Sequence, residues 1–326
     1  MKSNAWLVAI LAAITLLIAG GFLWYVFGGK IGQSSSYSHR NQKDETVVQR
    51  QNAFLNQTTT TIAHEMPGHD IVVVSSSASS STPSSTSKLP AIQDMQVNFG
   101  ILMYHYIGDT DPKLSKSAAS LHVTTENLEN QIKHLLDKGY HFVTLSEAYD
   151  MFIKNGKTPP KTLVLTFDDG YRSFYTNAFP VLKKYKVKAS AYIISQDIGH
   201  AGNVTWDMLK EISRSGLVEI GAHTVNHKNL KKLSDDDQRF QMGQNKKDLE
   251  EGLRIKVTTI VYPFGEHNTS TKQIAKELGF KGGAAVYNGS RPNTKDLYNW
   301  RRVQVQNKDV GDELMKVLYT AFELSR

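Results

Sequence analysis

The sequence contains no cysteine, and this absence removes several kinds of site from consideration. Without thiols there can be no disulfide framework, no thiolate metal ligand and no cysteine nucleophile. Any metal must therefore be bound by histidine, aspartate or glutamate side chains. The absence is compatible with a protein outside the cell, where disulfides are common but not obligatory.

The chain also lacks a concentrated block of positive charge. Lysine and arginine total 38 against 31 aspartates and glutamates, which gives a formal net charge of +7 at pH 7. Because this excess is mild and forms no aromatic–basic stripe, we expect no nucleic-acid partner. It is better suited to contact with anionic polymers of a cell surface.

Charged residues are missing entirely from one run near the N-terminus. The run Ala5–Phe27 is uncharged and apolar, and it is long enough to cross about 30 Å of hydrocarbon as a helix. It exceeds the apolar core of about 7 to 15 residues in a secretory signal peptide, and no clear cleavage site follows it. We therefore expect residues 1–32 to anchor the chain in the cell membrane as a single pass, with the remainder outside. The alternative is a secreted protein whose signal segment is removed.

Large apolar residues are scarce in the segment 33–97. Between Ser75 and Ser87, eleven of thirteen residues are serine or threonine. Such a segment cannot bury enough apolar surface to offset its chain entropy. We predict a disordered linker over 33–97 and a globular domain over 98–326, and we expect this domain to be a monomer.

Short β-rich runs alternate with amphipathic helical stretches throughout the globular domain. Strands are predicted at 101–105, 163–167, 189–194, 217–223, 257–262, 282–286 and 303–305. Helices are predicted at 124–139, 174–185, 206–215, 235–253, 271–278 and 312–323. This alternation indicates one α/β domain with a parallel sheet, either a barrel or an open doubly wound sheet.

A pair of adjacent carboxylates follows the apolar run Leu163–Leu165. The sequence Thr166–Gly170 reads TFDDG, so Asp168 and Asp169 lie at the carboxyl end of a predicted strand. Active sites of parallel α/β folds form at that edge of the sheet. Two neighbouring carboxylates repel each other unless a cation offsets them. An aspartate pair that only forms a turn before Gly170 is the alternative.

Two histidines four residues apart follow another predicted strand. The sequence His223–His227 reads HTVNH, and its two imidazoles can bind one ion if the segment turns. A histidine pair without metal is the alternative when this spacing is taken alone. Together with the Asp168–Asp169 pair, however, it provides an Asp/His/His set from two strand ends, with coordination positions left for water and substrate.

These motifs resemble those of the carbohydrate esterase family 4 polysaccharide deacetylases, whose catalytic part is the NodB homology domain. TFDDG matches the first motif of the family and HTVNH the second, and the resemblance covers most of residues 98–326. It implies a distorted (β/α)7-type barrel, a catalytic domain that hydrolyses an N-acetylated polysaccharide, and a divalent metal, usually zinc, with cobalt or nickel as other choices. It also implies that Asp168 is the general base and that the ion is bound by Asp169, His223 and His227.

Later segments resemble further motifs of the family less closely. Val261–Gly265 resembles the third motif, and the backbone N–H of Phe264 would then help to bind an oxyanion. Trp300–Val303 resembles the fourth, in which Arg302 would orient Asp168; a strand edge with solvated arginines is the alternative. We expect the substrate to contact Tyr171, Tyr262, Pro263 and Trp300.

The last motif of the family is absent. Many relatives place a histidine in a Leu-x-x-His segment near the C-terminus, whereas residues 311–326 contain none. A general acid is still needed to protonate the departing amine. We predict that His105, at the end of the strand ILMYH, supplies it, with His267 as the second choice.

The early strand that ends in His105 is similar to that of the family branch that acts on poly-β-1,6-N-acetylglucosamine. This resemblance favours that exported adhesin as the substrate, ahead of peptidoglycan N-acetylglucosamine and of an O-acetyl ester on a plant-type glycan. An inactive carbohydrate-binding relative is the alternative from another class. The complete TFDDG and HTVNH segments argue against it, because a binding module needs no cluster of metal ligands.

Overall fold

The computed structural model describes residues 90–91, 94–109, 115–287 and 289–324. The predicted membrane segment and nearly all of the predicted linker lie outside these residues. Within the described ranges, no helix is both long and apolar enough to span a membrane. Met95 and Val97, just before the predicted start of the domain, are buried, and the backbone N–H of Val97 donates to the Tyr140 hydroxyl.

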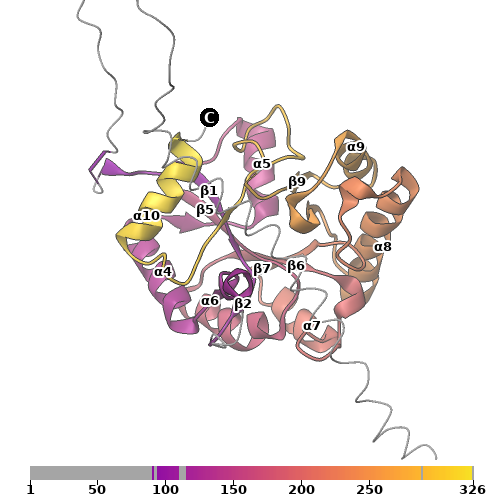
Figure 1. The fold of residues 1–326 in the computed structure, drawn as a ribbon, viewed down its shortest axis with the longest axis horizontal. Coiled ribbons are helices and arrows are strands. Elements are labelled where there is room, and N and C mark those ends of the chain that lie inside the picture. Colours follow the sequence, from indigo (N-terminus) through magenta and orange to yellow (C-terminus); the bar gives the residue numbers. More distant parts are fainter. Residues whose placement is uncertain (1–89, 92–93, 110–114, 288, 325–326) are drawn as a thin grey trace, which may run out of the picture.

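A curved parallel sheet forms the centre of the molecule (Figure 1). Its order is β10–β1–β5–β6–β7–β8–β9, with β4 also paired to β5, and every described pair in it is parallel. The strands are β1 (Phe99–Tyr104), β4 (His141–Phe142), β5 (Thr162–Phe167), β6 (Ala189–Ile193), β7 (Val218–Ala222), β8 (Thr259–Val261), β9 (Gly282–Ala284) and β10 (Val303–Gln304). A small second sheet pairs β2 (Tyr106–Ile107) with β3 (His122–Val123).

The segment Trp300–Gln304 brings the two edges of the curved sheet together. Its last two residues form β10, which pairs with β1. Trp300 forms an isolated parallel bridge with Ala284 of β9, and the N–H of Ala285 donates to the Trp300 carbonyl over 2.8 Å. The sheet therefore curls toward closure as in a (β/α) barrel, which agrees with the predicted α/β fold and its parallel sheet.

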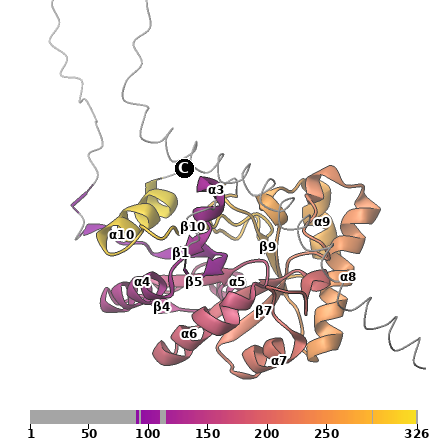
Figure 2. The same ribbon diagram turned by 60° about the horizontal axis from the view of Figure 1, so that its bottom comes forward.

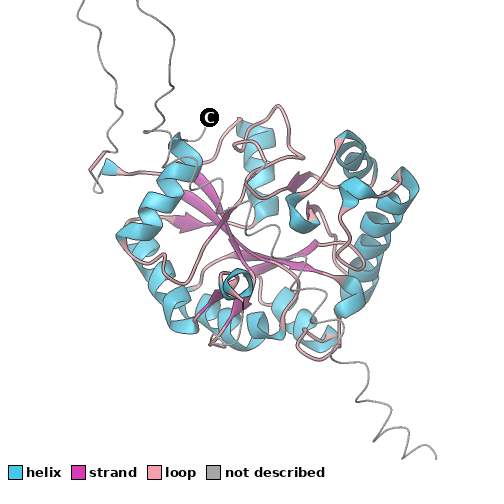
Figure 3. Cartoon of the chain, viewed as in Figure 1, coloured by secondary structure: helices cyan, strands magenta, loops and turns pink. Residues whose placement is uncertain are grey.

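Helices cover the outer face of this sheet, as Figure 3 shows with strands in magenta and helices in cyan. They are α3 (Lys116–Ala119), α4 (Thr125–Asp137), α5 (Leu145–Asn155), α6 (Phe179–Tyr185), α7 (Trp206–Arg214), α8 (Asp235–Leu253), α9 (Thr269–Glu277) and α10 (Asp312–Tyr319). The C-terminal α10 lies beside β1 and α4 in both views (Figures 1 and 2). Two helices lie apart from this outer layer: α3, which lies above β10 in Figure 2, and α5, whose apolar face packs inside the barrel.

The two faces of the strands pack into two different apolar clusters. Leu102 of β1 and Leu165 of β5 belong to the cluster under the outer helices, whereas Ile101 and Val164 belong to the inner one. Because side chains alternate along a strand, burial on both faces requires unbroken apolar runs. This is why the seven predicted strands appear in the sequence as continuous apolar runs.

The sequence reading missed α5. Its beginning carries a capping box, in which Thr144 accepts from the backbone N–H of Glu147 and the Glu147 carboxylate accepts from that of Thr144. Its buried residues Leu145, Ala148, Tyr149 and Phe152 recur at helical spacing. These two signals together were sufficient to find the helix.

Trp300 should contribute strongly to stability, because it is fully buried and its ring stacks on Tyr149 at 4.0 Å between centroids. We expect Trp300→Ala to lower the free energy of unfolding by about 3–5 kcal/mol. Urea denaturation measures the change. The control is Ile153→Ala on α5, where the side chain is 56% exposed and the expected change is within about 0.5 kcal/mol. Equal urea midpoints for the two variants would contradict this role.

Candidate metal centre and active site

Side chains that point into the barrel from the strands continue, at the ends of those strands, as residues that line a pocket. From Ile101 in the interior, steps of two residues along β1 lead to Met103 and then to His105. The same steps along β5 lead from Val164 to Asp168. Because the strands are parallel, these residues meet at the carboxyl edge of the sheet, where α/β folds form their active sites.

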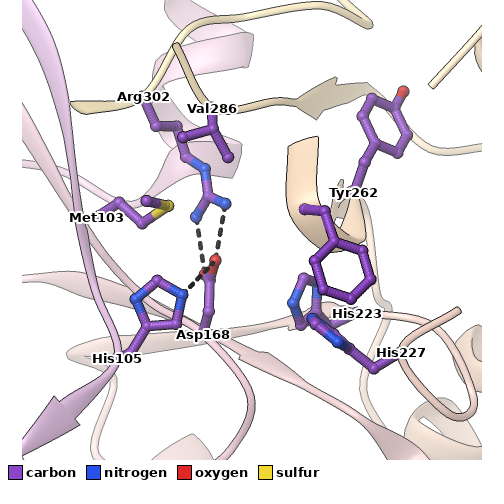
Figure 4. A pocket seen from close by; sticks show the side chains of 9 residues that line it. Met103, His105, Asp168, His223, His227, Tyr262, Val286 and Arg302 are labelled. Atoms are coloured by element: carbon purple, nitrogen blue, oxygen red, sulfur yellow. Dashed lines mark hydrogen bonds and ion pairs between the residues drawn. The ribbon is translucent and has the colours of Figure 1, made fainter. Parts of the chain in front are cut away.

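The pocket collects residues from six separate segments of the sequence. Figure 4 shows His105, Asp168 and Arg302 on one side and the two histidines His223 and His227 on the other. The lining residues are Met103, His105, Asp168, His223, His227, Tyr262, Phe264, Val286 and Arg302.

Asp169 and the two histidines converge on one point. Asp169 Oδ1 lies 3.3 Å from His223 Nε2 and 3.4 Å from His227 Nε2. This oxygen is buried and accepts no hydrogen bond. One ligand atom from each residue lies within 4.8 Å of the other two. A buried carboxylate oxygen without a donor, facing two imidazole nitrogens, fits the ligand set of a divalent ion such as zinc.

A backbone carbonyl on the side away from Asp169 fixes the orientation of the His223 ring. Its Nδ1 lies 2.8 Å from the carbonyl oxygen of Val261 at the end of β8, which leaves Nε2 to face Asp169. Metal-binding histidines usually donate their second ring N–H in this way. The ring of His227 lies edge-on to that of Phe264, with centroids 4.5 Å apart.

Asp168 is held by Arg302 instead. Arg302 Nη1 donates to Asp168 Oδ1 and Nη2 to Oδ2, each over 2.7 Å, and both residues are buried. Thr166 supports the guanidinium by accepting from Nη1 over 3.0 Å. Burial alone would raise the pKa of Asp168, but the charge and hydrogen bonds of Arg302 outweigh it and lower that pKa. The carboxylate is therefore ionised at neutral pH.

His105 lies next to this pair, with its Nε2 4.0 Å from Asp168 Oδ2. Its side chain is 15% exposed, so it can reach a molecule in the pocket. Burial lowers the pKa of His105, although the charges of Asp168 and Asp169 oppose that shift.

The backbone at the site is strained. Among the described residues, seven that are not glycine have a positive φ, and four of these are Asp169, Thr224, His227 and Phe264, at 71°, 67°, 58° and 61°. Each such conformation costs of the order of 1–3 kcal/mol and persists only where the surroundings enforce it. At Asp169 it turns the side chain away from that of Asp168, so that adjacent carboxylates face different partners.

Three of the residues predicted to contact the substrate do not line this pocket. Trp300 is fully buried below the pocket, and its Nε1 donates to the Asn293 carbonyl. Pro263 is buried and Tyr171 half-buried, and neither lines the pocket. His267, the second choice for the acid, stacks on Tyr262 with ring centroids 5.0 Å apart and also lies outside the lining.

Two apolar lining residues, Met103 and Val286, were missed by the sequence reading. Met103 could have been found, since it precedes His105 by two residues and so shares its face of β1. Val286 follows the end of β9, and no local pattern marks it.

Comparisons with known proteins agree with this geometry. The family model described as polysaccharide deacetylase matches residues 155–283. YxkH of Bacillus subtilis (strain 168), whose name describes a polysaccharide deacetylase, is 35% identical over 205 residues, covering 63% of this chain and 70% of its own. The chain belongs to the polysaccharide deacetylase family.

Two further members are similar to it. The poly-β-1,6-N-acetyl-D-glucosamine N-deacetylase of Staphylococcus aureus (strain N315) is 31% identical over 198 residues, which cover 56% of this chain and 68% of that one. The structure of Streptococcus pyogenes deacetylase PplD in complex with acetate has a TM-score of 0.63 and 32% identity, and the match covers 68% of this chain and 99% of PplD. As a polysaccharide deacetylase, the protein is a hydrolase of carbon–nitrogen bonds.

Arg302→Gln should change the pH dependence of this deacetylase. Burial raises the pKa of Asp168, and Arg302 normally opposes this shift. Without the guanidinium, we therefore expect the pKa of Asp168 to rise. We expect the acidic limb of the kcat/KM profile to move to higher pH by roughly 1–3 units. Arg302→Lys keeps the positive charge and should move it less. An acidic limb that stays in place in Arg302→Gln would show that Arg302 does not set the protonation of this carboxylate.

Proposed function

We propose that this protein is a metal-dependent de-N-acetylase of an N-acetylglucosamine polymer, and that poly-β-1,6-N-acetylglucosamine is its substrate. The observation that carries the proposal is that two adjacent carboxylates at one edge of the sheet face different partners. Asp169 Oδ1 faces His223 and His227 and accepts no hydrogen bond, whereas both oxygens of Asp168 accept hydrogen bonds from Arg302. The first arrangement suits a divalent ion and the second suits a fixed base.

A divalent ion bound to Asp169, His223 and His227 would polarise the acetamido carbonyl and lower the pKa of water. Asp168 then accepts the proton of the attacking water, because Arg302 keeps its carboxylate ionised and immobile. The backbone N–H of Phe264, on the pocket wall beside His227, is the proposed donor to the developing oxyanion.

His105 is the proposed acid for the departing amine. It lies in the same pocket, and its Nε2 is 4.0 Å from Asp168 Oδ2, so a proton taken up by Asp168 is close to the imidazole. Burial lowers the pKa of His105, and a protonated His105 therefore gives up its proton readily to the amine. Acetate and a free amino group on the polymer are the products.

The choice of β-1,6 linkage is supported by the Staphylococcus aureus relative, whose name specifies this polymer. The position of the proposed acid at the end of β1 also supports it, since the chain has no histidine in residues 311–326. The site of action that we propose is the outer face of the cell membrane, because the uncharged run Ala5–Phe27 is long enough to anchor the chain.

Asp168→Asn tests the proposed base. The amide has nearly the same shape but cannot accept the proton, so we expect kcat for acetate release to fall by roughly 10²–10⁴-fold. Zinc should remain bound, because Asp168 is not among the three ligands. Acetate release and zinc content are measured on the same preparation. Turnover equal to that of the parent protein would remove Asp168 from the reaction.

Metal removal tests the other half of the proposal. Acetate release is measured on β-1,6 and β-1,4 N-acetylglucosamine oligomers of equal length, before chelation, after it and after zinc, cobalt or nickel is added back. We expect activity to disappear and return with the metal, and to be higher on the β-1,6 oligomer. Full activity in chelator would contradict metal dependence, and a preference for the β-1,4 oligomer would contradict the proposed substrate.

A further inference from the structure

The loop His223–His227 cannot satisfy its own backbone hydrogen bonds. Thr224 and His227 both have left-handed backbone conformations, so the loop follows neither a helix nor a strand. Buried N–H and C=O groups without partners are costly, and native structures pair nearly all of them. One pairing is internal, from the His227 N–H to Thr224 Oγ1 over 3.1 Å.

Asn245 of α8 pairs with two of these backbone groups, one on His223 and one on Thr224. Its Oδ1 accepts from the His223 N–H over 3.1 Å, and its Nδ2 donates to the Thr224 carbonyl over 2.7 Å and to the Ile193 carbonyl over 3.0 Å. The residue is fully buried. One side chain thus joins the end of β6 to two peptide units of the segment in which the loop leaves β7.

Two further residues of α8 extend this contact along the same face of the helix. The backbone carbonyl and the side chain of Gln241 accept from the N–H groups of Val225 and Asn226. Asp248 accepts from the Ser195 hydroxyl over 2.8 Å, just after β6. Residues 241, 245 and 248 are spaced by four and three positions, so they share one helix face. This helix runs along the flank of the sheet (Figure 1).

These hydrogen bonds affect the distance between the imidazoles of His223 and His227. His223 and His227 belong to this loop, and their Nε2 atoms must both lie near Asp169 Oδ1 for one ion to bind. The direct support that each ring receives comes from elsewhere: Val261 O for His223 and the Phe264 ring for His227. The backbone between the two histidines is held on one side by α8. On the other side, the N–H groups of Ser195 and Gln196 donate to the Thr224 and Val225 carbonyls over 3.4 and 3.0 Å.

We propose that Asn245 is a positioning residue for the metal site, which sets the backbone path between His223 and His227 so that both rings reach one ion. This inference rests on the proposed metal dependence and adds a residue outside the motifs that carry the ligands. Asn245 is not among the three candidate ligands and does not line the pocket, so its effect should appear first in metal affinity.

The experiment compares Asn245→Ala with Gln238→Ala in the full chain. Gln238 is a matched control, because it is a fully buried amide of the same helix whose partners are the Leu233 carbonyl and the Thr271 hydroxyl. The dissociation constant for zinc is measured by competition with a chromogenic chelator. The unfolding midpoint of each metal-free protein is recorded alongside.

We expect Asn245→Ala to weaken zinc binding by about 10–100-fold, as is usual when the support of a metal ligand is removed. Gln238→Ala should lower the unfolding midpoint by a similar amount but leave zinc affinity within about twofold of the parent. A buried amide that served only stability would give the two variants the same zinc affinity, and that result would overturn the proposal.

Gln241→Ala provides a second test if Asn245→Ala does not fold. It removes only the hydrogen bond to the Asn226 N–H and should weaken zinc binding a few-fold. Unchanged affinity in this variant would also count against the role of α8. A parent protein that binds no zinc, cobalt or nickel would instead overturn the proposed metal dependence, and the positioning role would fall with it.

Discussion

The buried carboxylate of Asp169 is the constraint on which the rest of the site depends. Its Oδ1 accepts no hydrogen bond and faces two imidazole nitrogens at 3.3 and 3.4 Å. Removing a carboxylate from water costs several kcal/mol unless charge and hydrogen bonds compensate. The nearby imidazoles, His227 foremost, outweigh the effect of burial and hold the pKa of Asp169 well below its ordinary value. A site built this way favours a bound cation over a proton.

Adjacent positions in the sequence acquire opposite roles because the backbone turns between them. Asp168 continues the inward face of β5 and meets Arg302, whereas the left-handed conformation of Asp169 directs its side chain toward the histidines. The two carboxylates therefore do not share a proton or a cation. Closing the barrel through the segment Trp300–Gln304 is what brings Arg302 to Asp168, so the fold and the ionisation of the proposed base depend on the same segment.

The sequence alone predicted the strands and the convergence of Asp169, His223 and His227 for a physical reason. Strands buried on both faces must be continuous apolar runs, and parallel strands must end at one edge, so TFDDG and HTVNH had to lie near each other. Trp300 was expected to contact the substrate because it shares a strand face with Arg302. The alternation of side chains predicts which face a residue occupies, but it does not predict how far along the barrel axis the residue lies from the pocket. The role of α8 had no local signal, since Gln241 and Asn245 look like ordinary polar residues of an exposed helix until their burial is known.

We infer that Asp169, His223 and His227 together bind one divalent ion. Anomalous diffraction from crystals of the zinc-loaded protein, recorded on both sides of the zinc absorption edge, tests it most directly. We expect one strong peak at about 2.0–2.2 Å from Asp169 Oδ1 and from Nε2 of both histidines. No peak between these three side chains, or a zinc ion bound only elsewhere on the chain, would contradict it.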